Sequence, residues 1–462
     1  MTKQLPGPVL HWPGKNAGSS EPPGLLREDK AKGYGDTHTG NLFIHGDNLP
    51  VLKTLQNDYA GRIKFIYIDP PYNTGAAFEY YDDKLGHAAW LDAIHQRLQL
   101  FRTLLTEDGF FACHIDDSEG HYLKVLLDEV FGRENYLTTF FIRVRYPGKT
   151  LKQDMDFHKE MEQIHLYRKS SKSRPRRPET AMSFEKFVFS IGELAPGTVT
   201  TIGGKQARIF QKGEYRIIRN ATGDAHGLKE IWASGSILDG NSSGRFFRDH
   251  LTGRYVEDGY GVLYKIYGIG DDRYDHRYFT GPKKAGATKG KYFQGVPVMH
   301  LESDVSQKSA PINNFYDLAA SFGNCRQEGG VDFRSGKKPE ALLHILLSHF
   351  SAEDDYVLDG FLGSGTTAAV AHKMKRKWIG IETGEHMDTH CLPRLRSIVD
   401  GNDQTGITEE VGWQGGGGFK FFTMEPAPSH APQPPTQLHQ PRQPQMYNQP
   451  TKDRPGPRSD HP

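Results

Sequence analysis

The chain has 462 residues, of which 36% are hydrophobic and 24% are charged, and its formal net charge is +1. This length accommodates a large core and two domains, whereas the near-zero charge excludes a uniformly basic nucleic-acid-binding protein. Its three cysteines form no CxxC pair, which argues against a zinc or disulfide framework. Because the N-terminus has no apolar signal core and no stretch is long enough to span a membrane, we expect a cytoplasmic protein.

Residues 1–40 are rich in Gly, Pro and charge without an apolar period, so we predict a loose N-terminal arm. A short strand over 41–45 follows, and the spacing of leucines predicts a helix over 48–55. Asp47 stands between the two elements. Its carboxylate would either cap the helix or accept a hydrogen bond from a ligand, and the residues alone favour capping.

The stretch that organises the chain is Asp69-Pro70-Pro71-Tyr72. The run before it, 63–68, is β-branched and aromatic, which predicts a strand buried on both faces of a parallel sheet. Proline ends such a strand, and open α/β sheets bind ligands at the carboxyl ends of their strands. Asp69 and the Pro70 carbonyl can accept the two hydrogens of a nucleobase amine, and a flipped base can stack on Tyr72. A proline turn that merely ends a strand is the alternative.

Helices and strands then alternate up to about residue 170. We predict helices over 90–105 and 119–131 and strands over 110–115 and 158–167. Carboxylates gather at 116–119, where helix capping explains Asp116 better than a metal site does. The 162–165 segment lacks the HExxH pattern, and we predict no metal site in the chain.

The composition changes over 171–330, which is Gly-rich and aromatic and reads as short strands and loops. This range holds 23 Lys and Arg residues against 17 Asp and Glu residues, which leaves a net charge of +6. Basic residues interleaved with Tyr and Phe suit a nucleic-acid surface, although a solvated, loop-rich face explains the same composition.

The α/β pattern resumes over 331–425. A strand over 356–359 leads into a glycine-rich turn, then a helix over 368–375 and a strand over 377–381. Gly363 and Gly365 let the backbone approach a ligand closely, and Glu382, 21 residues past Phe361, is placed to take ribose hydroxyls. No GxxxxGK[ST] motif occurs, which excludes a phosphate-binding loop of that type. Residues 426–462 are rich in Pro, Gln and His and predict a disordered tail.

Together these residues resemble the DNA amino-methyltransferases that use S-adenosylmethionine. The amine-binding stretch comes first, a variable region follows and the glycine loop comes last, an order similar to the β class of these enzymes. Finer motifs look like the modification (Mod) subunits of type III restriction-modification systems. The motifs are Gly46-Asp47-Asn48-Leu49, 66–75, Ile115-Asp116-Asp117, 131–135, Lys337-Lys338-Pro339-Glu340, 363–367 and 415–419. The match covers about 41–170 and 331–425.

The resemblance implies a role for each matching position. Asp69, Pro70, Pro71 and Tyr72 would hold the target base. The cofactor would contact Asp47, Lys338, Pro339, Asp359, Phe361, Gly363, Gly365, Thr366 and Glu382. It also implies double-stranded DNA as a partner, a homodimer, and a helicase-nuclease restriction subunit as a further partner.

We therefore predict a doubly wound, Rossmann-like α/β methyltransferase fold with permuted motif order. Its catalytic half would be 41–170 and its cofactor-binding half 331–425, with an inserted target-recognition domain, rich in loops and strands, over 171–330. The predicted function is transfer of a methyl group from S-adenosylmethionine to N6 of adenine in double-stranded DNA. One alternative is N4 of cytosine, against which the acid at position 69 argues. Another is a DNA-recognition subunit with a vestigial loop, against which intact Asp69 and Gly363 argue.

Overall fold

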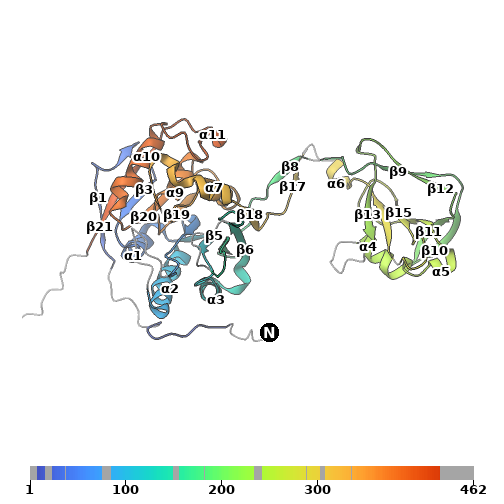
Figure 1. Ribbon diagram of the computed structural model, residues 1–462, viewed down its shortest axis with the longest axis horizontal. Coiled ribbons are helices and arrows are strands. Elements are labelled where there is room, and N and C mark those ends of the chain that lie inside the picture. The colour runs from blue at the N-terminus through green and yellow to red at the C-terminus, as the bar shows by residue number, and fades with distance from the viewer. Residues whose placement is uncertain are drawn as a thin grey trace, which may run out of the picture.

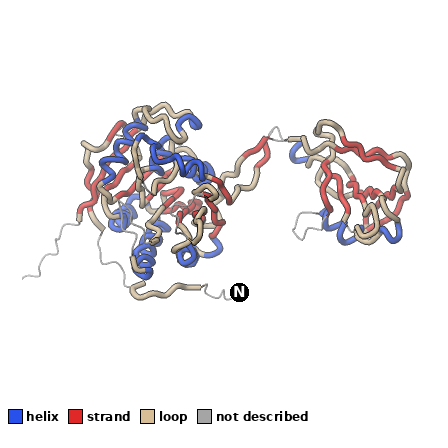
Figure 2. Tube along the Cα trace, viewed as in Figure 1, coloured by secondary structure: helices blue, strands red, loops and turns tan. Residues whose placement is uncertain are grey.

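The protein folds into two bodies that are joined by a two-stranded ribbon (Figures 1 and 2). The computed structural model describes residues 8–15, 23–36, 38–74, 85–148, 156–181, 183–233, 242–287, 289–301, 307–334 and 336–426. The ribbon consists of β8 (Glu179–Ala181) and β17 (Gln307–Ser309), which pair antiparallel. Within the described ranges, no helix is both long enough and apolar enough to cross a membrane.

The larger body is built on an 11-stranded sheet with the order β1-β21-β3-β20-β19-β4-β5-β7-β6-β18, and β2 pairs with β21. Its strands are β1 (Leu25–Glu28), β2 (Tyr34–Gly35), β3 (Leu42–His45), β4 (Ile63–Ile68), β5 (Leu105–Ile115), β6 (Tyr136–Arg143), β7 (Met161–Arg168), β18 (Phe315–Asp317), β19 (Tyr356–Asp359), β20 (Lys377–Glu382) and β21 (Gly418–Glu425). The strands from β21 to β5 run parallel, and β7 lies antiparallel between β5 and β6. This mainly parallel sheet confirms the predicted α/β fold.

The order of the strands in this sheet differs from their order in the chain. β19 and β20 follow the insert in sequence, yet they lie between β3 and β4 in the sheet. Because these four strands are parallel, their carboxyl ends share one edge. The permuted order therefore brings residues from both ends of the chain to the same place.

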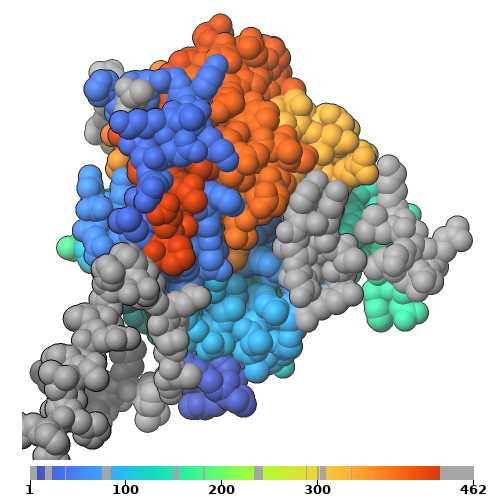
Figure 3. All heavy atoms as spheres, turned by 90° about the vertical axis from the view of Figure 1, so that its left-hand side faces the viewer, coloured from blue at the N-terminus to red at the C-terminus, as the bar shows by residue number. Residues whose placement is uncertain are grey.

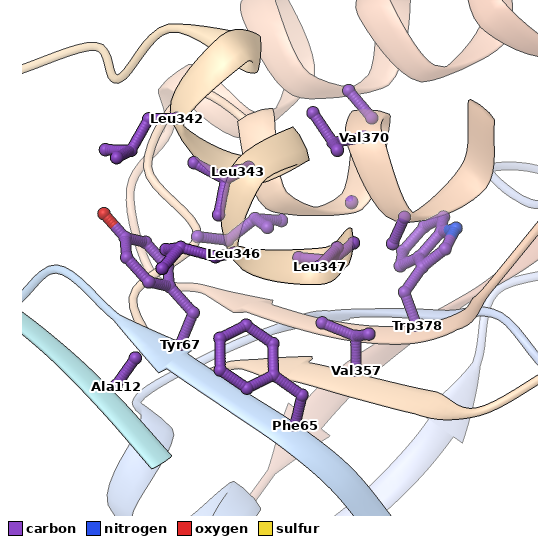
Figure 4. Packing of buried hydrophobic residues seen from close by; sticks show 14 of the residues in the cluster. Phe65, Tyr67, Ala112, Leu342, Leu343, Leu346, Leu347, Val357, Val370 and Trp378 are labelled. Atoms are coloured by element: carbon purple, nitrogen blue, oxygen red, sulfur yellow. The ribbon is translucent and has the colours of Figure 1, made fainter. Parts of the chain in front are cut away.

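Helices cover both faces of the sheet, and Phe65 and Tyr67 of β4 point to one face while Ile66 and Ile68 point to the other. One face carries α1 (Asn48–Tyr59), α2 (His87–Leu104) and α3 (Gly120–Phe131), and the other carries α8 (Glu340–Phe350), α9 (Thr366–Lys373) and α10 (Leu392–Val399). Figure 4 shows the leucines of α8 above Phe65 and Tyr67. All four β4 residues are buried, which confirms the predicted burial on both faces. Burial of each such side chain contributes about 1.5–3 kcal/mol to the stability of the fold.

Short helical segments complete the larger body. They are η1 (Arg133–Asn135), α7 (Ala319–Asn324), η3 (Cys325–Gly330), η4 (Met387–Cys391) and α11 (Thr408–Val411). Gly132, with φ +89°, ends α3 and leads into η1. Its positive φ is one that glycine adopts without strain, as expected for a residue that closes a helix.

The smaller body is an antiparallel sheet with the order β10-β11-β14-β15-β16-β13, and a separate antiparallel pair of β9 and β12 lies beside it. Its elements are β9 (Phe189–Glu193), β10 (Thr198–Ile202), β11 (Lys205–Phe210), β12 (Tyr215–Arg219), β13 (Lys229–Ala233), α4 (Ser242–Phe246), η2 (Phe247–Leu251), α5 (Tyr255–Asp258), β14 (Leu263–Tyr267), β15 (His276–Thr280), β16 (Gly290–Gln294) and α6 (Val298–Leu301). Buried clusters within 189–293 give it hydrophobic cores of its own.

The insert is shorter at both ends than the predicted range 171–330. At its start, the Ser173 hydroxyl donates to the Gly109 carbonyl of the larger sheet at 3.0 Å. At its end, β18 pairs with β6, and α7 and η3 follow it in the larger body. The ribbon of β8 and β17 therefore marks the boundary. A three-residue strand such as β18 carries too little periodicity to be recognised from the sequence.

The prediction of a loose arm over 1–40 is wrong for its second half. β1 and β2 both pair antiparallel with β21, which would otherwise be an edge strand of the sheet. Figure 3 shows the N-terminal segment, in blue, against the red β21. Pairing satisfies the backbone groups of β21 that an open edge would expose. The predicted disordered tail lies outside the described residues beyond Pro426.

Candidate active site

A cavity of about 890 Å³ opens where β3, β4, β19 and β20 end. Every one of these strands brings an acidic residue to its lining: Asp47, Asp69, Asp359 and Glu382 respectively. All the predicted site residues line this cavity except Pro339 and Gly365. The sheet edge thus gathers the Asp69-Pro70-Pro71-Tyr72 turn and the glycine loop, which are nearly 300 residues apart in sequence, around one cavity.

The Asp69-Pro70-Pro71-Tyr72 turn is held from both sides. The Trp90 indole N–H donates to the Pro71 carbonyl at 2.8 Å, which fixes the turn to α2. The Tyr72 hydroxyl donates to Asp69 Oδ1 at 2.9 Å. Burial and the nearby carboxylates raise the pKa of Tyr72 well above its usual value, so the hydroxyl keeps its proton. The Asp69 carboxylate and the Tyr72 ring therefore face the cavity in a fixed arrangement.

Lys338 lies on the Asp69 side of the cavity, although the resemblance assigns it to the cofactor. Its Nζ is 3.1 Å from Asp69 Oδ2 and 3.6 Å from Glu162 Oε2. The same ammonium lies 4.9 Å from the centroid of the Tyr72 ring. Burial favours the neutral amine, but the two carboxylates outweigh it and raise the pKa of Lys338. Lys338 is therefore a charged member of the group that contains Asp69, Tyr72 and Glu162.

Glu162 is the residue that sequence reasoning missed. Its Oε2 accepts from the Tyr72 hydroxyl at 3.2 Å and lies 2.9 Å from His114 Nε2. Burial alone would raise the pKa of Glu162, but Lys338, His114 and Tyr72 hold it well below its usual range. The sequence predicts a strand over 158–167 that contains Glu162 and no metal site there, but it assigns this residue no role. The available signal was a carboxylate within a predicted strand, because such a residue needs a partner when it points inward.

Asp359 and the glycine loop form the opposite wall. The Phe361 amide donates to Asp359 Oδ1 at 2.8 Å, and the Thr367 hydroxyl donates to Oδ2 at 2.5 Å. Burial raises the pKa of Asp359 to about 7, and the charges of Asp69 and Glu382 act in the same direction. This carboxyl therefore titrates near neutral pH, which is typical of a functional site.

Gly363 is the loop residue that leaves room for a ligand. Its φ is +56°, and a Cβ built there meets no atom closer than 3.9 Å. A Cβ at Gly365, with φ +82°, would instead lie 3.7 Å from Cys391. Gly365 thus serves the left-handed turn before α9, and its side faces protein, not the cavity. The Thr366 hydroxyl donates to the Lys338 carbonyl at 3.0 Å and ties the loop to the Asp69 side of the cavity.

The other two acids are bound to backbone amides. Glu382 accepts from the Gly363 amide at 2.7 Å and from the Gly384 amide at 2.8 Å, so it braces the glycine loop. Asp47 accepts from the Leu49 amide at 2.7 Å and caps α1, as its sequence context favours. The Asp47 carboxylate also lies 3.2 Å from Arg97 of α2. Asp116, by contrast, accepts from Ser118 rather than from the first turn of α3.

A buried ionic network lies behind the glycine loop. Arg394 of α10 donates to the Ser364 carbonyl at 3.1 Å and pairs with Glu340 at 2.8 Å. Lys373 pairs with Glu340 at 2.8 Å and with Asp403 at 2.7 Å. Glu340 is the first residue of α8. Pro339 does not line the cavity, but it joins Lys338 of the cavity lining to Glu340 of this network.

Known proteins share this sequence organisation. A family model described as DNA methylase matches residues 63–389. The chain is 31% identical over 422 residues to the probable type III restriction-modification enzyme HindVI Mod subunit of Haemophilus influenzae, covering 84% of this chain and 54% of that protein. It is 28% identical over 417 residues to the EcoPI Mod subunit of Escherichia phage P1, covering 79% and 60% respectively. The chain thus spans little more than half the length of these relatives.

Among solved structures, the chain is similar to the PvuII DNA methyltransferase, described as cytosine-N4-specific. That match has a TM-score of 0.39 and 13% identity, and covers 81% of this chain and 91% of the other. The family model carries the assignment, because its match over residues 63–389 spans both the Asp69-Pro70-Pro71-Tyr72 turn and the glycine loop as well as the insert between them. The chain therefore belongs to the DNA methylase family.

Proposed function

We propose that this protein transfers a methyl group from S-adenosylmethionine to N6 of adenine in double-stranded DNA. The observation that carries the proposal is one cavity that joins Asp69 and Tyr72 to the glycine loop and Glu382. A methyl donor and a flipped base held in such a cavity would have their reacting atoms close together. Positioning of this kind is the main contribution that an enzyme makes to a displacement reaction.

The glycine-loop wall fits the proposed cofactor. Open space at Gly363 lets a ligand approach the backbone, while Asp359 and Glu382 offer carboxylates to its amino and hydroxyl groups. When bound, S-adenosylmethionine supplies an electrophilic methyl group on a sulfonium centre. We expect Gly363→Val to fill the space at the loop and weaken cofactor binding by at least an order of magnitude. Calorimetry checks this expectation, and unchanged binding would refute the assignment of the loop.

The opposite wall fits the target amine. Its nitrogen lone pair is delocalised into the base, so acceptors that hold both amino hydrogens favour the geometry of attack. Asp69 provides one acceptor, and the Pro70 carbonyl is proposed as the other. Stacking on Tyr72 would contribute roughly 1–3 kcal/mol to capture of the base. The preorganised turn makes these contacts available without rearrangement.

Adenine is proposed over cytosine because the first position of the motif is an acid, Asp69. The decisive experiment incubates the purified protein with S-adenosylmethionine and duplex DNA and separates the product nucleosides. N6-methyladenine is the expected product. N4-methylcytosine would overturn the choice of base, and no methylated base from a protein that binds cofactor and DNA would overturn the proposal.

We further propose that the smaller body selects the DNA sequence. Supporting features are its independent core, its basic and aromatic composition and its separation from the larger body by the ribbon of β8 and β17 (Figure 1). Exchange of residues 183–301 for the corresponding segment of a relative should change the methylated sequence without changing the methylated base. Sequencing of DNA with modified bases identified, from a host without other methylation, provides the readout.

The names of the relatives support a modification subunit that pairs with a restriction subunit, and we propose the same here together with a homodimer. Sedimentation of the protein alone tests the homodimer. Co-purification with a restriction subunit of a type III system tests the second partner. A monomer that methylates at its full rate when dilute would contradict the dimer.

A further inference from the structure

The residues proposed to bind the target amine contact charged side chains that the proposed function does not yet use, namely Glu162 and Lys338. Two carboxylates, Asp69 and Glu162, share two donors, the Tyr72 hydroxyl and the Lys338 ammonium. The hydroxyl has a single hydrogen, whereas the ammonium has three. Lys338 can therefore serve either carboxylate, and its position between them raises the question of which one it serves when a base is bound.

In the structure, Asp69 is already occupied. Tyr72 donates to Oδ1, and Lys338 lies beside Oδ2 at 3.1 Å. A cation on a carboxylate draws charge from the oxygens and competes with an incoming amine for them. For Asp69 to become a strong acceptor for the target amine, Lys338 must withdraw from it. A buried ammonium cannot withdraw without another counterion, because an unpaired charge in such a site is costly.

Glu162 is placed to be that counterion. Its Oε2 lies 3.6 Å from the same Nζ, so a small rotation of the Lys338 side chain exchanges the two partners. Glu162 itself is fixed, because His114 contacts its Oε2 and the Tyr67 hydroxyl in turn lies 2.9 Å from His114 Nδ1. Both His114 and Tyr67 are buried in the larger body. The mobile member of the group is therefore the lysine and not the glutamate.

We propose that Glu162 is a positioning residue for methyl transfer: it accepts the Lys338 ammonium when the target base arrives and so frees Asp69 for the target amine. The inference rests on the proposed function, because it concerns how Asp69 becomes available to a substrate. It adds two residues to the reaction, Glu162 as the alternative counterion and Lys338 as the cation that moves.

Crystal structures of the wild type and of Asp69→Asn test the exchange without any need for catalysis. The substitution removes the charge at position 69 and keeps its shape. We expect Lys338 Nζ to lie closer to residue 69 in the wild type and closer to Glu162 in the variant. A lysine that stays beside the new amide in the variant, or that leaves both positions, would overturn the proposal.

Turnover of an unmethylated duplex that carries the sequence the enzyme modifies tests the consequence. In Glu162→Gln the lysine has only Asp69, so we expect kcat to fall by on the order of 10²-fold while KM for DNA changes little. Glu162→Asp should recover part of the loss. Removing the lysine as well, in Glu162→Gln/Lys338→Met, should free Asp69 and give faster turnover than Glu162→Gln alone. Glu160→Gln, which alters a surface residue paired with Arg143, is the matched control and should stay within about twofold of the wild type.

The two experiments separate the possible failures. A double variant as slow as Glu162→Gln, or slower, would mean that Glu162 acts only by supporting the fold, and a Glu162→Gln protein with normal kcat would remove it from the reaction. Cofactor affinity and thermal unfolding of each variant show whether the fold is intact. If the wild type methylates no DNA, the proposed function fails, whereas the crystal structures still decide whether the lysine exchanges partners.

Discussion

The larger body buries charged side chains around its cavity, whereas the smaller body keeps most of its described ion pairs near the surface. In the larger body, Lys373, Glu340 and Arg394 have side chains with 0% exposure. In the smaller body, the Arg248–Asp249 pair is 43% and 46% exposed, and the partners in Lys291–Glu230 are 26% and 27% exposed. Both bodies have apolar cores, so the difference lies in what their charges do.

Buried charges cost desolvation energy and are retained where a fixed position is needed. In the larger body they hold α8, α9 and α10 to the glycine loop and hold Lys338 to Asp69. Surface charges cost little and can be replaced without unfolding the protein. A body that selects a sequence benefits from such freedom, because its surface can change while its core stays the same.

The largest expected effect comes from the same substitution made in each body. Arg394→Met leaves Glu340 buried with one cation fewer, and we expect a loss of about 3–5 kcal/mol in the free energy of unfolding. Arg248→Met removes an exposed pair and should cost less than about 1 kcal/mol. Denaturant titration measures both values, and similar losses in the two variants would contradict the comparison.

One pair in the smaller body can sharpen the contrast. Arg277 lies 2.9 Å from Asp272, and their side chains are 2% and 1% exposed. If burial and not location sets the cost, Arg277→Met should destabilise the protein nearly as much as Arg394→Met. It should leave cofactor affinity unchanged, however, because it is remote from the glycine loop. Calorimetry with S-adenosylmethionine distinguishes the two variants, and weaker binding in Arg277→Met would refute the separation of roles.

The next largest effect concerns catalysis. Asp69→Ala removes the proposed acceptor for the target amine, and by analogy with a single group in an oxyanion hole, turnover should fall on the order of 10²–10³-fold. Cofactor and DNA binding should persist. Asp108→Ala is the control, since Asp108 pairs with Lys64 at the other end of β4 and should tolerate the change. Single-turnover methylation provides the readout, and near wild-type activity in Asp69→Ala would falsify the mechanism.

Much of the larger body could be predicted from the sequence because its signals are local. The 63–68 run, the prolines after it and the glycines of the loop each mark an element or its end within a few residues. The shared sheet edge then follows from parallel strands. The pairing of β1 and β2 with β21 could not be predicted, because it joins segments nearly 400 residues apart and local composition does not report such a partner.

The site was predicted to a similar extent. Asp69, Tyr72, Asp359 and Glu382 were predicted because each follows a recognisable strand. Glu162 was not, since β7 is antiparallel and approaches Tyr72 from 90 residues away in sequence. The position of Lys338 was also unpredicted, because its side chain contacts Asp69 and Glu162, which lie far from it in the sequence. Sequence motifs identify strand ends, whereas contacts between side chains from different strands require the fold.

A smaller effect is expected at the surface of the smaller body. Trp232 of β13 is 60% exposed, and Lys291 lies 4.7 Å from its ring. Exposed aromatic rings beside cations stack on bases, so Trp232→Ala should weaken DNA binding by roughly 1–3 kcal/mol and leave cofactor binding unchanged. Phe315→Ala, an exposed aromatic of the larger body, is the matched control. Equal loss in both variants in a fluorescence titration would contradict a DNA-binding role for the smaller body.

The most gradual effect expected is a pH dependence of the free energy of unfolding that arises from Asp359. Its pKa in the folded protein is raised to about 7 from an ordinary value of 3.8, so between these values the folded state binds more protons than the unfolded state. The free energy of unfolding should therefore fall as pH rises through this window, by at most about 1.4 kcal/mol per pH unit from this group.

The Asp359→Asn variant cannot ionise at this position and does not lose this stability. Its stability relative to the wild type should increase from pH 5 to about 7 and level off above that, because Asp359 is then ionised in both states. Denaturant titrations of the two proteins at matched pH provide the difference, in which the other titrating groups cancel. A difference that stays constant from pH 5 to 8 would mean that the Thr367 hydroxyl and the Phe361 amide stabilise the carboxylate enough to offset its burial.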